Sequence, residues 1–504
     1  MSAINKNILR GLLISSYILL IVLIVFGISA IYSYLNTGAD RSSLLHTKIE
    51  AKEHYTPKVT WETISNEGRP IDEQTLKTIE SDYLEALYVK HVAFKTNLKE
   101  GISDFYSANA RATIFNTIDL NAAKNTTIES TTLEHHLTLT FFSEDGQLAV
   151  LKDNNVVEYK RVYSNNTLVH ETDEIANYKI VLLLEDGFWR VRHLVREATI
   201  KPSKPLQTLS LSKVDIKGIN YYPQDTPWDL FGDNFNIEII NKDFKIISDA
   251  KLNTIRLFIP YDSFGKATVI KNKLEKLKQV LDNAETNNLK VMLTLFDFYG
   301  DYSVLDWTRT QKHATTIVSA FKTHPAIAAW DIKNEPNLDF ESRGELVVTS
   351  WLKHMIPHVK GIDPNHPVTI GWSNAKSATI LQNDLDFVSF HYYENLSDLD
   401  ATIKTLKTEI PNKAIVLSEF GLSSYNGIWN PFGASNKKQA NYFKDAQAIL
   451  KQNKLSFLSW TLYDFKTVPK KVVGHLPWRK NPQKEFGFIN TNGEKKPAFK
   501  FIAE

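Results

Sequence analysis

Short apolar runs alternate with longer amphipathic segments from residue 211 to residue 504. Eight of the runs have the length of a buried β-strand: 216–221, 254–259, 291–296, 326–332, 367–371, 387–391, 414–417 and 456–461. Helical spacing of apolar residues marks the segments 237–250, 274–287, 311–322, 344–360 and 437–451. Parallel strands need a crossover connection, usually a helix, and eight strand–helix units close into a barrel. The alternation therefore predicts an α/β fold, with a (β/α)8 TIM barrel over residues 211–504.

A doubly wound parallel sheet is the alternative fold for such an alternation. That fold commonly binds a dinucleotide through a Gly-x-Gly-x-x-Gly turn after its first strand, and no such turn follows residues 216–221. The chain also contains no cysteine, which excludes a disulfide framework, a zinc–thiolate site and a thiol nucleophile. We therefore favour the barrel and expect no metal or organic cofactor.

The carboxyl ends of the strands form the active site of such a barrel, so the residues there indicate its chemistry. They are polar, aromatic and acidic: Asn220, Arg256, Asp297, Asn334, Glu335, His391, Tyr393, Glu419 and Trp460. Glu335 lies in Trp330-Asp-Ile-Lys-Asn-Glu-Pro336, and Glu419 lies in Leu417-Ser-Glu-Phe-Gly421. Retaining glycoside hydrolysis uses two carboxyl groups about 5–5.5 Å apart, one as acid/base and one as nucleophile. The sequence therefore predicts Glu335 and Glu419 as the catalytic pair.

These motifs resemble those of glycoside hydrolase clan A, and they are closest in style to the cellulases and mannanases of family 5. In the fourth-strand motif of that clan, the glutamate is the acid/base and the preceding asparagine holds the 2-hydroxyl of the sugar. The resemblance implies these roles for Glu335 and Asn334. Ser418-Glu-Phe-Gly421 resembles the seventh-strand motif, which implies that Glu419 is the nucleophile.

The resemblance extends over residues 212–504 and includes further strand ends. Arg256 resembles the second-strand arginine that orients the nucleophile, and His391 and Tyr393 resemble the sixth-strand pair that positions these groups. Trp460 resembles the eighth-strand tryptophan under the sugar. Many family 5 enzymes carry a histidine near the end of the third strand, where this chain has Asp297, so the subfamily and the substrate are left open. Asn220 and Asp297 complete the expected substrate-binding set.

The two roles require different protonation states. The nucleophile must be ionised, and the positive charge of Arg256 is expected to lower the pKa of Glu419. The acid must be protonated, and burial together with the negative charge of Glu419 is expected to raise the pKa of Glu335. Once Glu419 is esterified this repulsion ends, and Glu335 can act as base toward water.

His354 and His358 have the spacing of a helical metal site, but they lack an accompanying acidic motif and Pro357 lies between them. We interpret the two histidines as part of a solvated helix face.

The N-terminus carries a long apolar run, with no charged residue between Arg10 and Asp40. A helix that rises 1.5 Å per residue needs about 20 apolar residues to cross a bilayer, and residues 11–31 supply that length. A cleaved signal peptide is the alternative, but its apolar region is usually only about 7–15 residues long. Lys6 and Arg10 favour a cytoplasmic N-terminus. We expect a single-pass anchor within residues 1–35, with the catalytic domain outside the cytoplasm, in the periplasm or at the cell surface.

Residues 36–70 are polar and have no clear period, which predicts a stalk. Over 71–196, helical spacing comes first and an expected second helix covers 102–113; alternating strands follow, with a hairpin turn at 185–187. Helices followed by antiparallel strands indicate a small α+β domain. Its order, and the final strand at 187–195, resemble the cone-like nuclear transport factor 2-like family, whose relatives are often docking domains, so a protein partner is expected there. Two prolines mark a linker at 197–210.

A net charge of +2 gives no reason to expect a nucleic-acid partner. The function expected from the sequence is that of a membrane-anchored, extracytoplasmic retaining β-glycosidase acting on a β-linked glucan or mannan. The alternatives are a transglycosylase, in which a sugar replaces water as acceptor, and a non-catalytic glycan-binding or assembly subunit. The sugar, its linkage, endo or exo action and the oligomeric state are left open.

Overall fold

The computed structural model describes residues 15–28, 54–62, 66–200, 209, 211, 213–428, 430–474 and 476–503. They belong to two compact units, Met1–His54 and Tyr55–Glu504. In the first unit, residues 15–28 form a helix. The other residues of the expected span 11–31, and residues 36–53 of the expected stalk, lie outside the described residues. Over the described part of the chain, no helix combines the length and the apolar character that crossing a bilayer requires.

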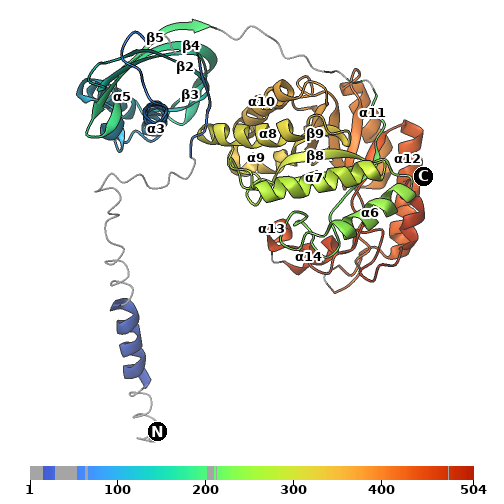
Figure 1. Cartoon of the computed structure of the whole chain (residues 1–504). Coiled ribbons are helices and arrows are strands. Elements are labelled where there is room, and N and C mark those ends of the chain that lie inside the picture. The colour runs from blue at the N-terminus through green and yellow to red at the C-terminus, as the bar shows by residue number, and fades with distance from the viewer. Residues whose placement is uncertain are drawn as a thin grey trace, which may run out of the picture. The chain divides into compact units, whose positions relative to one another are not determined.

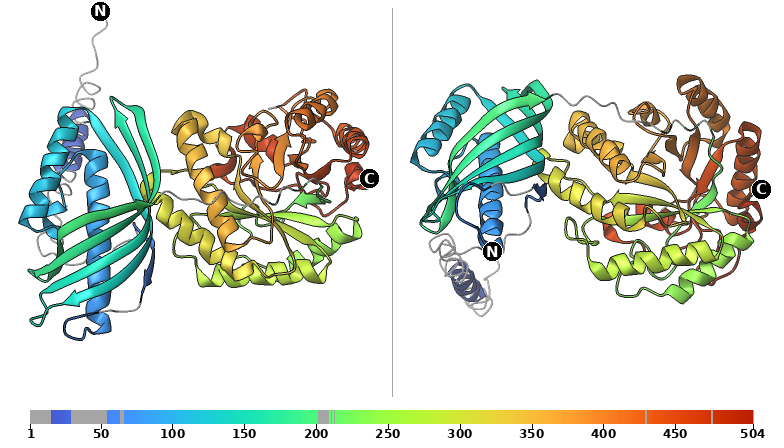
Figure 2. Two further views of the ribbon diagram at one scale, coloured as in Figure 1. Left: turned by 90° about the horizontal axis from the view of Figure 1, so that it is seen from above. Right: turned by 45° about the horizontal axis from the view of Figure 1, so that its top comes forward.

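The second unit begins with an N-terminal sheet domain, which we define as residues 55–200. Its elements are β1 (Lys58–Trp61), α3 (Glu73–Thr96), α4 (Ile102–Phe105), α5 (Ala108–Ala123), β2 (Thr126–Phe142), β3 (Leu148–Ser164), β4 (Thr167–Glu185) and β5 (Phe188–Ile200). The sheet order follows the chain, and β2 to β5 are antiparallel. Figure 1 and Figure 2 show this curved sheet around α3. Tyr83 and Leu87 of α3 are buried against the sheet, as the helical spacing predicts.

Three local predictions in this domain need comment. The hairpin at 185–187 is confirmed, because Asp186 and Gly187 both have positive φ, as the favoured two-residue turn requires. The single helix expected at 102–113 is wrong: extended backbone at Tyr106, which bridges to β5, separates α4 from α5. Parts of the expected stalk and linker belong to the sheet instead. Within the stalk, β1 pairs with β2, and at the start of the linker β5 continues to Ile200. Edge pairing of the backbone needs no apolar pattern, so the sequence carried no signal for it.

The C-terminal part of the unit is a closed eight-stranded barrel. Its strands are β6 (Lys217–Asn220), β7 (Thr254–Pro260), β8 (Lys290–Asp297), β9 (Ile327–Asn334), β10 (Val368–Trp372), β11 (Val388–Tyr392), β12 (Ile415–Phe420) and β13 (Ser456–Ser459). Each strand pairs in parallel with the next, and β13 pairs with β6 to close the ring. The eight-stranded barrel predicted from the alternating runs is confirmed.

Helices cover the outside of the barrel (Figure 1). The longer ones are α6 (Ile237–Asp249), α7 (Lys271–Thr286), α8 (Trp307–Phe321), α10 (Glu345–Ile362), α11 (Leu399–Glu409) and α12 (Asn436–Asn453). The shorter ones are η1 (Val304–Asp306), η2 (Pro336–Asp339), α9 (Phe340–Arg343), η3 (Ser377–Thr379), η4 (Leu396–Asp398), α13 (Lys470–Val473), α14 (Pro477–Gln483) and η5 (Pro497–Phe501). Residues 373–387, between β10 and β11, contain only the short turn η3 in place of a full helix. Helix α10 continues through Pro357.

Candidate active site

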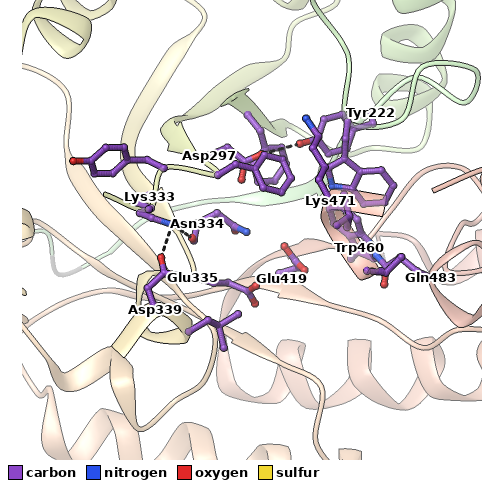
Figure 3. Close-up of a pocket in the computed structure, with 18 of the residues that line it drawn as sticks. Tyr222, Asp297, Lys333, Asn334, Glu335, Asp339, Glu419, Trp460, Lys471 and Gln483 are labelled. Atoms are coloured by element: carbon purple, nitrogen blue, oxygen red, sulfur yellow. Dashed lines mark hydrogen bonds and ion pairs between the residues drawn. The ribbon is translucent and has the colours of Figure 1, made fainter. Parts of the chain in front are cut away.

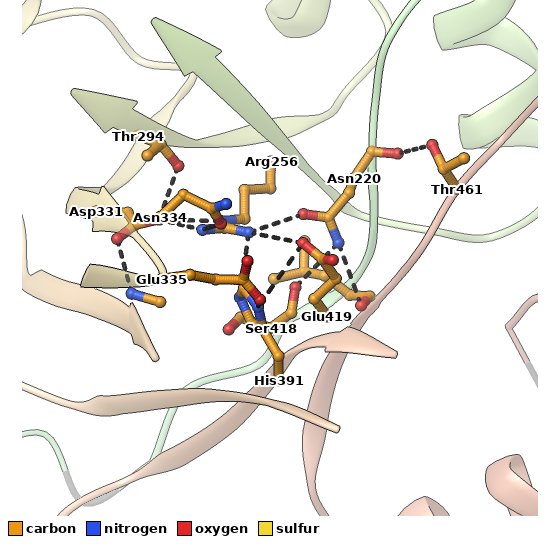
Figure 4. A network of polar contacts seen from close by, with 12 residues as sticks. Asn220, Arg256, Thr294, Asp331, Asn334, Glu335, His391, Ser418, Glu419 and Thr461 are labelled. Carbon is orange, nitrogen blue, oxygen red and sulfur yellow. Dashed lines mark hydrogen bonds and ion pairs between the residues drawn. The ribbon is translucent and has the colours of Figure 1, made fainter. Parts of the chain in front are cut away.

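The nine residues expected at the strand ends lie together at one end of the barrel. Six of them line a cavity of about 650 Å³: Asp297, Asn334, Glu335, Tyr393, Glu419 and Trp460. Asn220, Arg256 and His391 are fully buried below the cavity: Arg256 and His391 contact Glu419 and Glu335, and Asn220 accepts a hydrogen bond from Arg256. Figure 3 shows the cavity and Figure 4 shows the polar network beneath it.

Glu335 follows β9 in a tight turn, with φ 49° and ψ 48°, in the left-handed region that non-glycine residues seldom adopt. Its backbone N–H donates to the carbonyl oxygen of Gly371 on β10 at 2.7 Å. The turn is thus tied to the neighbouring strand. Backbone strain of this kind persists only where the surrounding structure enforces it, and it concentrates at functional sites.

Glu419 lies on β12 and has both carboxylate oxygens occupied. Oε1 accepts a hydrogen bond from the Tyr393 hydroxyl at 2.7 Å, and Oε2 accepts one from Arg256 Nη1 at 3.3 Å. A carboxylate oxygen of Glu419 lies within 4.8 Å of one of Glu335. This separation is in the range for a nucleophile and acid/base pair that share one sugar carbon.

His391 contacts both glutamates from β11. Its Nδ1 lies 2.9 Å from Glu335 Oε1, and its Nε2 lies 3.4 Å from Arg256 Nη1. A guanidinium group can only donate hydrogen bonds, so Nε2 accepts and Nδ1 carries the hydrogen that is donated to Glu335. Oε1 of Glu335 thus accepts the hydrogen bond from His391. When Glu335 is protonated as the acid, its proton therefore lies on Oε2.

Arg256 organises the floor of the site (Figure 4). Its Nε and Nη2 donate to Asp331 Oδ2 at 3.0 and 2.6 Å, and Nη2 also donates to Asn334 Oδ1 at 2.9 Å. Its Nη1 donates to Asn220 Oδ1 at 3.1 Å, in addition to Glu419. A planar group with five fixed donors can hold several acceptors at once, which an ammonium group cannot do.

Asp331 is one of the site residues that the sequence reasoning missed. It is fully buried, and it also accepts hydrogen bonds from Thr294 Oγ1 at 2.7 Å and from the backbone N–H of Gly371 at 2.9 Å. A signal was available, because side chains alternate along a strand and Asp331 shares its face with Lys333. A second missed feature is Gly371 itself. A Cβ there would lie 2.5 Å from Arg256 Nη2, so no larger residue fits without displacing the guanidinium.

The pKa shifts of the two glutamates are opposite to those expected. Burial raises the pKa of Glu419, and the charge of Glu335 adds to this effect. Burial acts on Glu335 too, but the hydrogen bond from His391 and the charges of Arg256 and Lys333 hold its pKa below the ordinary value. The charge of Arg256 lowers the pKa of Glu419 but does not offset the effect of burial. In the free site the pKa of Glu419 thus lies above its ordinary value and that of Glu335 below it.

Asp297 and Lys333 form a second polar group in the cavity (Figure 3). Burial raises the pKa of Asp297 to about 6, and the Tyr222 hydroxyl donates to its Oδ2 at 3.4 Å. Lys333 Nζ lies 3.4 Å from Asp339 Oδ2, and burial lowers the pKa of Lys333. These charged groups can donate to and accept from sugar hydroxyls. The sequence reasoning placed Asp297 here but missed Lys333, Asp339 and Tyr222.

Aromatic side chains form one wall of the cavity. Trp460 lies 5.7 Å, centroid to centroid, from Trp228, and Tyr222 stacks on Phe258 at 5.3 Å with planes 14° apart. All four rings line the cavity and are nearly buried. Aromatic faces in a wall like this can pack against the apolar C–H faces of a sugar.

Glu335, His391 and Glu419 also have potential metal-ligating atoms within 4.8 Å of one another. The hydrogen bonds already described account for this clustering. The cationic Arg256, 3.3 Å from Glu419 Oε2, would also repel a metal ion at this position. The donor set therefore fits a hydrogen-bonded carboxyl pair better than a metal site.

The interpretation of His354 and His358 as a solvated helix face is wrong. Both are half-buried, and burial lowers their pKa values, to about 3 and about 4. His354 stacks on Trp307 of α8 at 4.5 Å, and His358 Nε2 lies 2.9 Å from Thr315 Oγ1 of the same helix. Neighbouring helices α8 and α10 pack here, and the local sequence of α10 could not show which face its neighbour covers.

Comparisons with known proteins agree with this geometry. The family model described as cellulase (glycosyl hydrolase family 5) matches residues 213–466. The β-glucuronidase of Chlorocebus aethiops is 24% identical over 273 residues, which cover 49% of this chain and 39% of that protein. The putative mannan endo-1,4-beta-mannosidase 4 of Arabidopsis thaliana is 25% identical over 229 residues, covering 36% of this chain and 52% of its own. The chain thus spans about half the length, or less, of these curated relatives. A solved exo-beta-1,4-mannosidase, Op5Man5 from Opitutaceae bacterium strain TAV5, aligns with a TM-score of 0.49 and 16% identity, covering 60% of this chain and 61% of its own.

Proposed function

The chain belongs to glycosyl hydrolase family 5, and we propose that it cleaves β-glycosidic bonds with retention of configuration, by double displacement. The observation that carries the proposal is the distance of 4.8 Å or less between carboxylate oxygens of Glu335 and Glu419. Inverting enzymes place a water molecule between the carboxyl groups and separate them by about 6.5–9.5 Å. The pair in this site is too close for that arrangement.

In the first step, a carboxylate oxygen of Glu419 forms a bond to the anomeric carbon while the bond to the leaving oxygen breaks. Glu335 gives its proton, from Oε2, to that leaving oxygen. In the second step, Glu335 takes a proton from water, the water oxygen attacks the anomeric carbon, and Glu419 leaves as a carboxylate. The ester of the intermediate is thereby hydrolysed, and two inversions give net retention.

The mechanism also needs the opposite order of the two pKa values once substrate is bound, because in the free site burial raises that of Glu419 and His391 lowers that of Glu335. A sugar hydroxyl that donates to Glu419 would stabilise the carboxylate and leave the proton to Glu335. Asn334, held by Arg256 Nη2 at 2.9 Å, is placed to orient such a hydroxyl. Once Glu419 is esterified its negative charge is gone, which lowers the pKa of Glu335 and lets its carboxylate act as base toward water.

We propose a β-linked glucan or mannan, as polysaccharide or oligosaccharide, as the substrate. The support is a cavity of about 650 Å³ with an aromatic wall and the polar groups of Asp297 and Lys333. One of the relatives is named a mannan endo-1,4-beta-mannosidase, which is consistent with this class. A panel of β-glucan and β-mannan oligosaccharides and aryl β-glycosides would identify the sugar.

The decisive experiment compares Glu335→Ala and Glu419→Ala with the control Glu341→Ala, an exposed carboxylate on α9. Removal of Glu419 should lower kcat/KM on every substrate on the order of 10³-fold or more. Removal of Glu335 should lower kcat/KM by a smaller factor on an aryl glycoside with an acidic phenol, because that leaving group needs little protonation. NMR of the first product should show the β-anomer. Full activity in either variant, or an α-anomer as first product, would refute the assignment.

We propose further that residues 11–31 anchor the chain in a membrane with the barrel outside the cytoplasm. The support is the uncharged apolar sequence after Lys6 and Arg10. In cell fractionation the full chain should stay with alkali-washed membranes, and the double variant Ile21→Arg, Ile24→Arg should not. Protease added outside intact cells, or to spheroplasts, should digest the barrel; protection of the barrel in both would contradict the orientation.

The N-terminal sheet domain is proposed to have the nuclear transport factor 2-like fold over residues 71–196. The support is the long helix α3 against the curved sheet of β2 to β5. An experimental structure in which α3 lies outside that sheet would contradict the proposal.

A further inference from the structure

The N-terminal sheet domain packs against the barrel at one aromatic contact. Tyr159 of β3 and Trp307, the first residue of α8, lie with ring centroids 4.3 Å apart and planes 33° apart. Both are nearly buried, with exposed fractions of 7% and 1%. The backbone N–H of Thr56 donates to Thr308 Oγ1 at 3.1 Å beside them, and Leu133 of β2 is buried in the same core as the barrel. The contact is therefore a desolvated interface within the unit Tyr55–Glu504.

Trp307 is in turn bonded to the segment that lines the sugar cavity. The indole Nε1–H of Trp307 donates to the carbonyl oxygen of Tyr302 at 3.2 Å. Residues 298–303, which we call the β8 loop, connect β8 to η1, and Phe298, Tyr299 and Gly300 of this loop line the cavity. The backbone N–H of Tyr302 donates to the Tyr299 hydroxyl at 2.9 Å, so the loop is tied to itself at the point that Trp307 holds.

The β8 loop has a conformation that requires such support. Phe298 and Tyr302 both have φ of +59°, although neither is glycine. A bulky side chain in this region is disfavoured, and the conformation persists only where neighbouring groups enforce it. The Trp307 indole is one of those groups. Its own position is fixed by ring contacts with Tyr159 and, at 4.5 Å, with His354.

A second connection leads from Tyr302 toward the acid/base. The Tyr302 hydroxyl donates to Asp339 Oδ2, and the same oxygen lies 3.4 Å from Lys333 Nζ. Lys333 lines the cavity two residues before Glu335. The β8 loop is thus connected to the charged group that we expect to contact sugar hydroxyls, while Glu335 and Glu419 themselves are held by His391, Tyr393 and Arg256.

We propose that the N-terminal sheet domain supports the active site. Tyr159 and Trp307 are the positioning residues that hold the β8 loop in its substrate-binding conformation. Because the catalytic glutamates are held by separate contacts, loss of this support should weaken substrate binding and leave the chemical step nearly unchanged. The inference rests on the proposed glycosidase function for its kinetic consequence, but the loop conformation can be measured independently of any activity.

The test uses the variant Tyr159→Ala in the chain with its N-terminal domain intact. Loss of one buried aromatic pair corresponds to a change of about tenfold in an equilibrium constant, so KM should rise about tenfold while kcat stays within about twofold. Hydrogen exchange of the backbone amides in 298–306 should accelerate in the same variant. Tyr159→Phe, which keeps the ring, should restore the wild-type KM and exchange.

Tyr178→Ala is the matched control, because this tyrosine packs against the separate core of the N-terminal domain. It should change neither KM nor exchange in 298–306, and thermal unfolding should establish that both variants fold. Unchanged KM and unchanged exchange in Tyr159→Ala would overturn the proposal. So would equal effects in the two alanine variants, or a fall in kcat with constant KM. If the wild-type chain hydrolyses no β-glycoside, the proposed function fails, and the exchange measurement alone still decides whether the domain holds the loop.

Discussion

Replacement of Arg256 by lysine tests how the site is held together. The guanidinium is fully buried, and it donates to Asp331, Asn220, Asn334 and Glu419. Lysine preserves the positive charge but presents its donors from one atom. The strongest existing contact, to Asp331 Oδ2 at 2.6 Å, is the one that an ammonium group would keep. The contacts to Asn220, Asn334 and Glu419 would then be lost.

The magnitude for catalysis follows from the contacts to Asn334 and Glu419, because these two residues line the cavity and Asn220 does not. A hydrogen bond to a charged group contributes about 1.5–3 kcal/mol, and the 3.3 Å contact to Glu419 belongs at the low end of that range. The contact to Asn334 also has the charged guanidinium as donor, so it contributes about 1.5 kcal/mol as well. Together they amount to about 3 kcal/mol of transition-state stabilisation, which lowers kcat/KM by somewhat more than a hundredfold.

The assay is kcat/KM on an aryl β-glycoside, with circular dichroism and thermal unfolding to verify the fold. Arg196→Lys is the control, because Arg196 also contacts two acceptors, Glu158 at 2.9 Å and Glu174 at 2.8 Å, but lies in the N-terminal sheet domain. It should retain wild-type activity. An Arg256→Lys enzyme that keeps more than a third of its kcat/KM would refute the view that the forked guanidinium organises the site.

Three further changes test separate parts of the site. Tyr393→Phe removes the hydrogen bond to Glu419 Oε1 at 2.7 Å, so kcat should fall about tenfold, for a loss of about 1.5 kcal/mol. Gly371→Ala places a Cβ 2.5 Å from Arg256 Nη2, and overpacking costs about 1–3 kcal/mol, so the unfolding midpoint and kcat/KM should both drop. Asp297, whose pKa is raised to about 6, is ionised above that pH and neutral below it, so KM should rise as pH falls through about 6. In Asp297→Asn this limb of the KM profile should disappear.

Each of these expectations has a result that contradicts it. Wild-type kcat in Tyr393→Phe would mean that its hydroxyl does not position the nucleophile. An unchanged unfolding midpoint in Gly371→Ala would mean that the floor of the site can move to accept a methyl group. If the KM profile of Asp297→Asn keeps its inflection near pH 6, another group titrates there.

The barrel and most of its site could be predicted from the sequence, because the relevant signals are local. A parallel strand buried on both faces is an apolar run, and the residue that ends it lies at the rim of the barrel. Glu335 and Glu419 could be placed for that reason without any knowledge of their partners, whereas Arg256 lies inside β7 and was supported by the family resemblance. None of the five predicted helical segments fell between β10 and β11, and there a short turn makes the connection.

The parts that could not be predicted depend on residues far apart in the chain. Lys58–Trp61 were expected in the stalk but form β1, which pairs with β2 at the edge of the sheet through backbone groups. The solvated-face interpretation of His354 failed because α8 covers that side of α10. The expected pKa order of the two glutamates failed because burial raises the pKa of Glu419, whereas a hydrogen bond from the distant His391 lowers the pKa of Glu335.

The sequence by itself determined the identity and the order of the chemical groups at the strand ends, since side-chain period and strand length are properties of neighbouring residues. Only the tertiary structure decided how those groups are charged and held. It showed which oxygen of Glu335 is free to carry a proton and which carboxylate accepts the shortest hydrogen bond from Arg256. It also showed which tyrosine of the N-terminal sheet domain contacts Trp307. Hydrogen bonds and ring contacts of this kind join residues that no local pattern relates. Their strength also depends on burial, which exists only once the chain has folded.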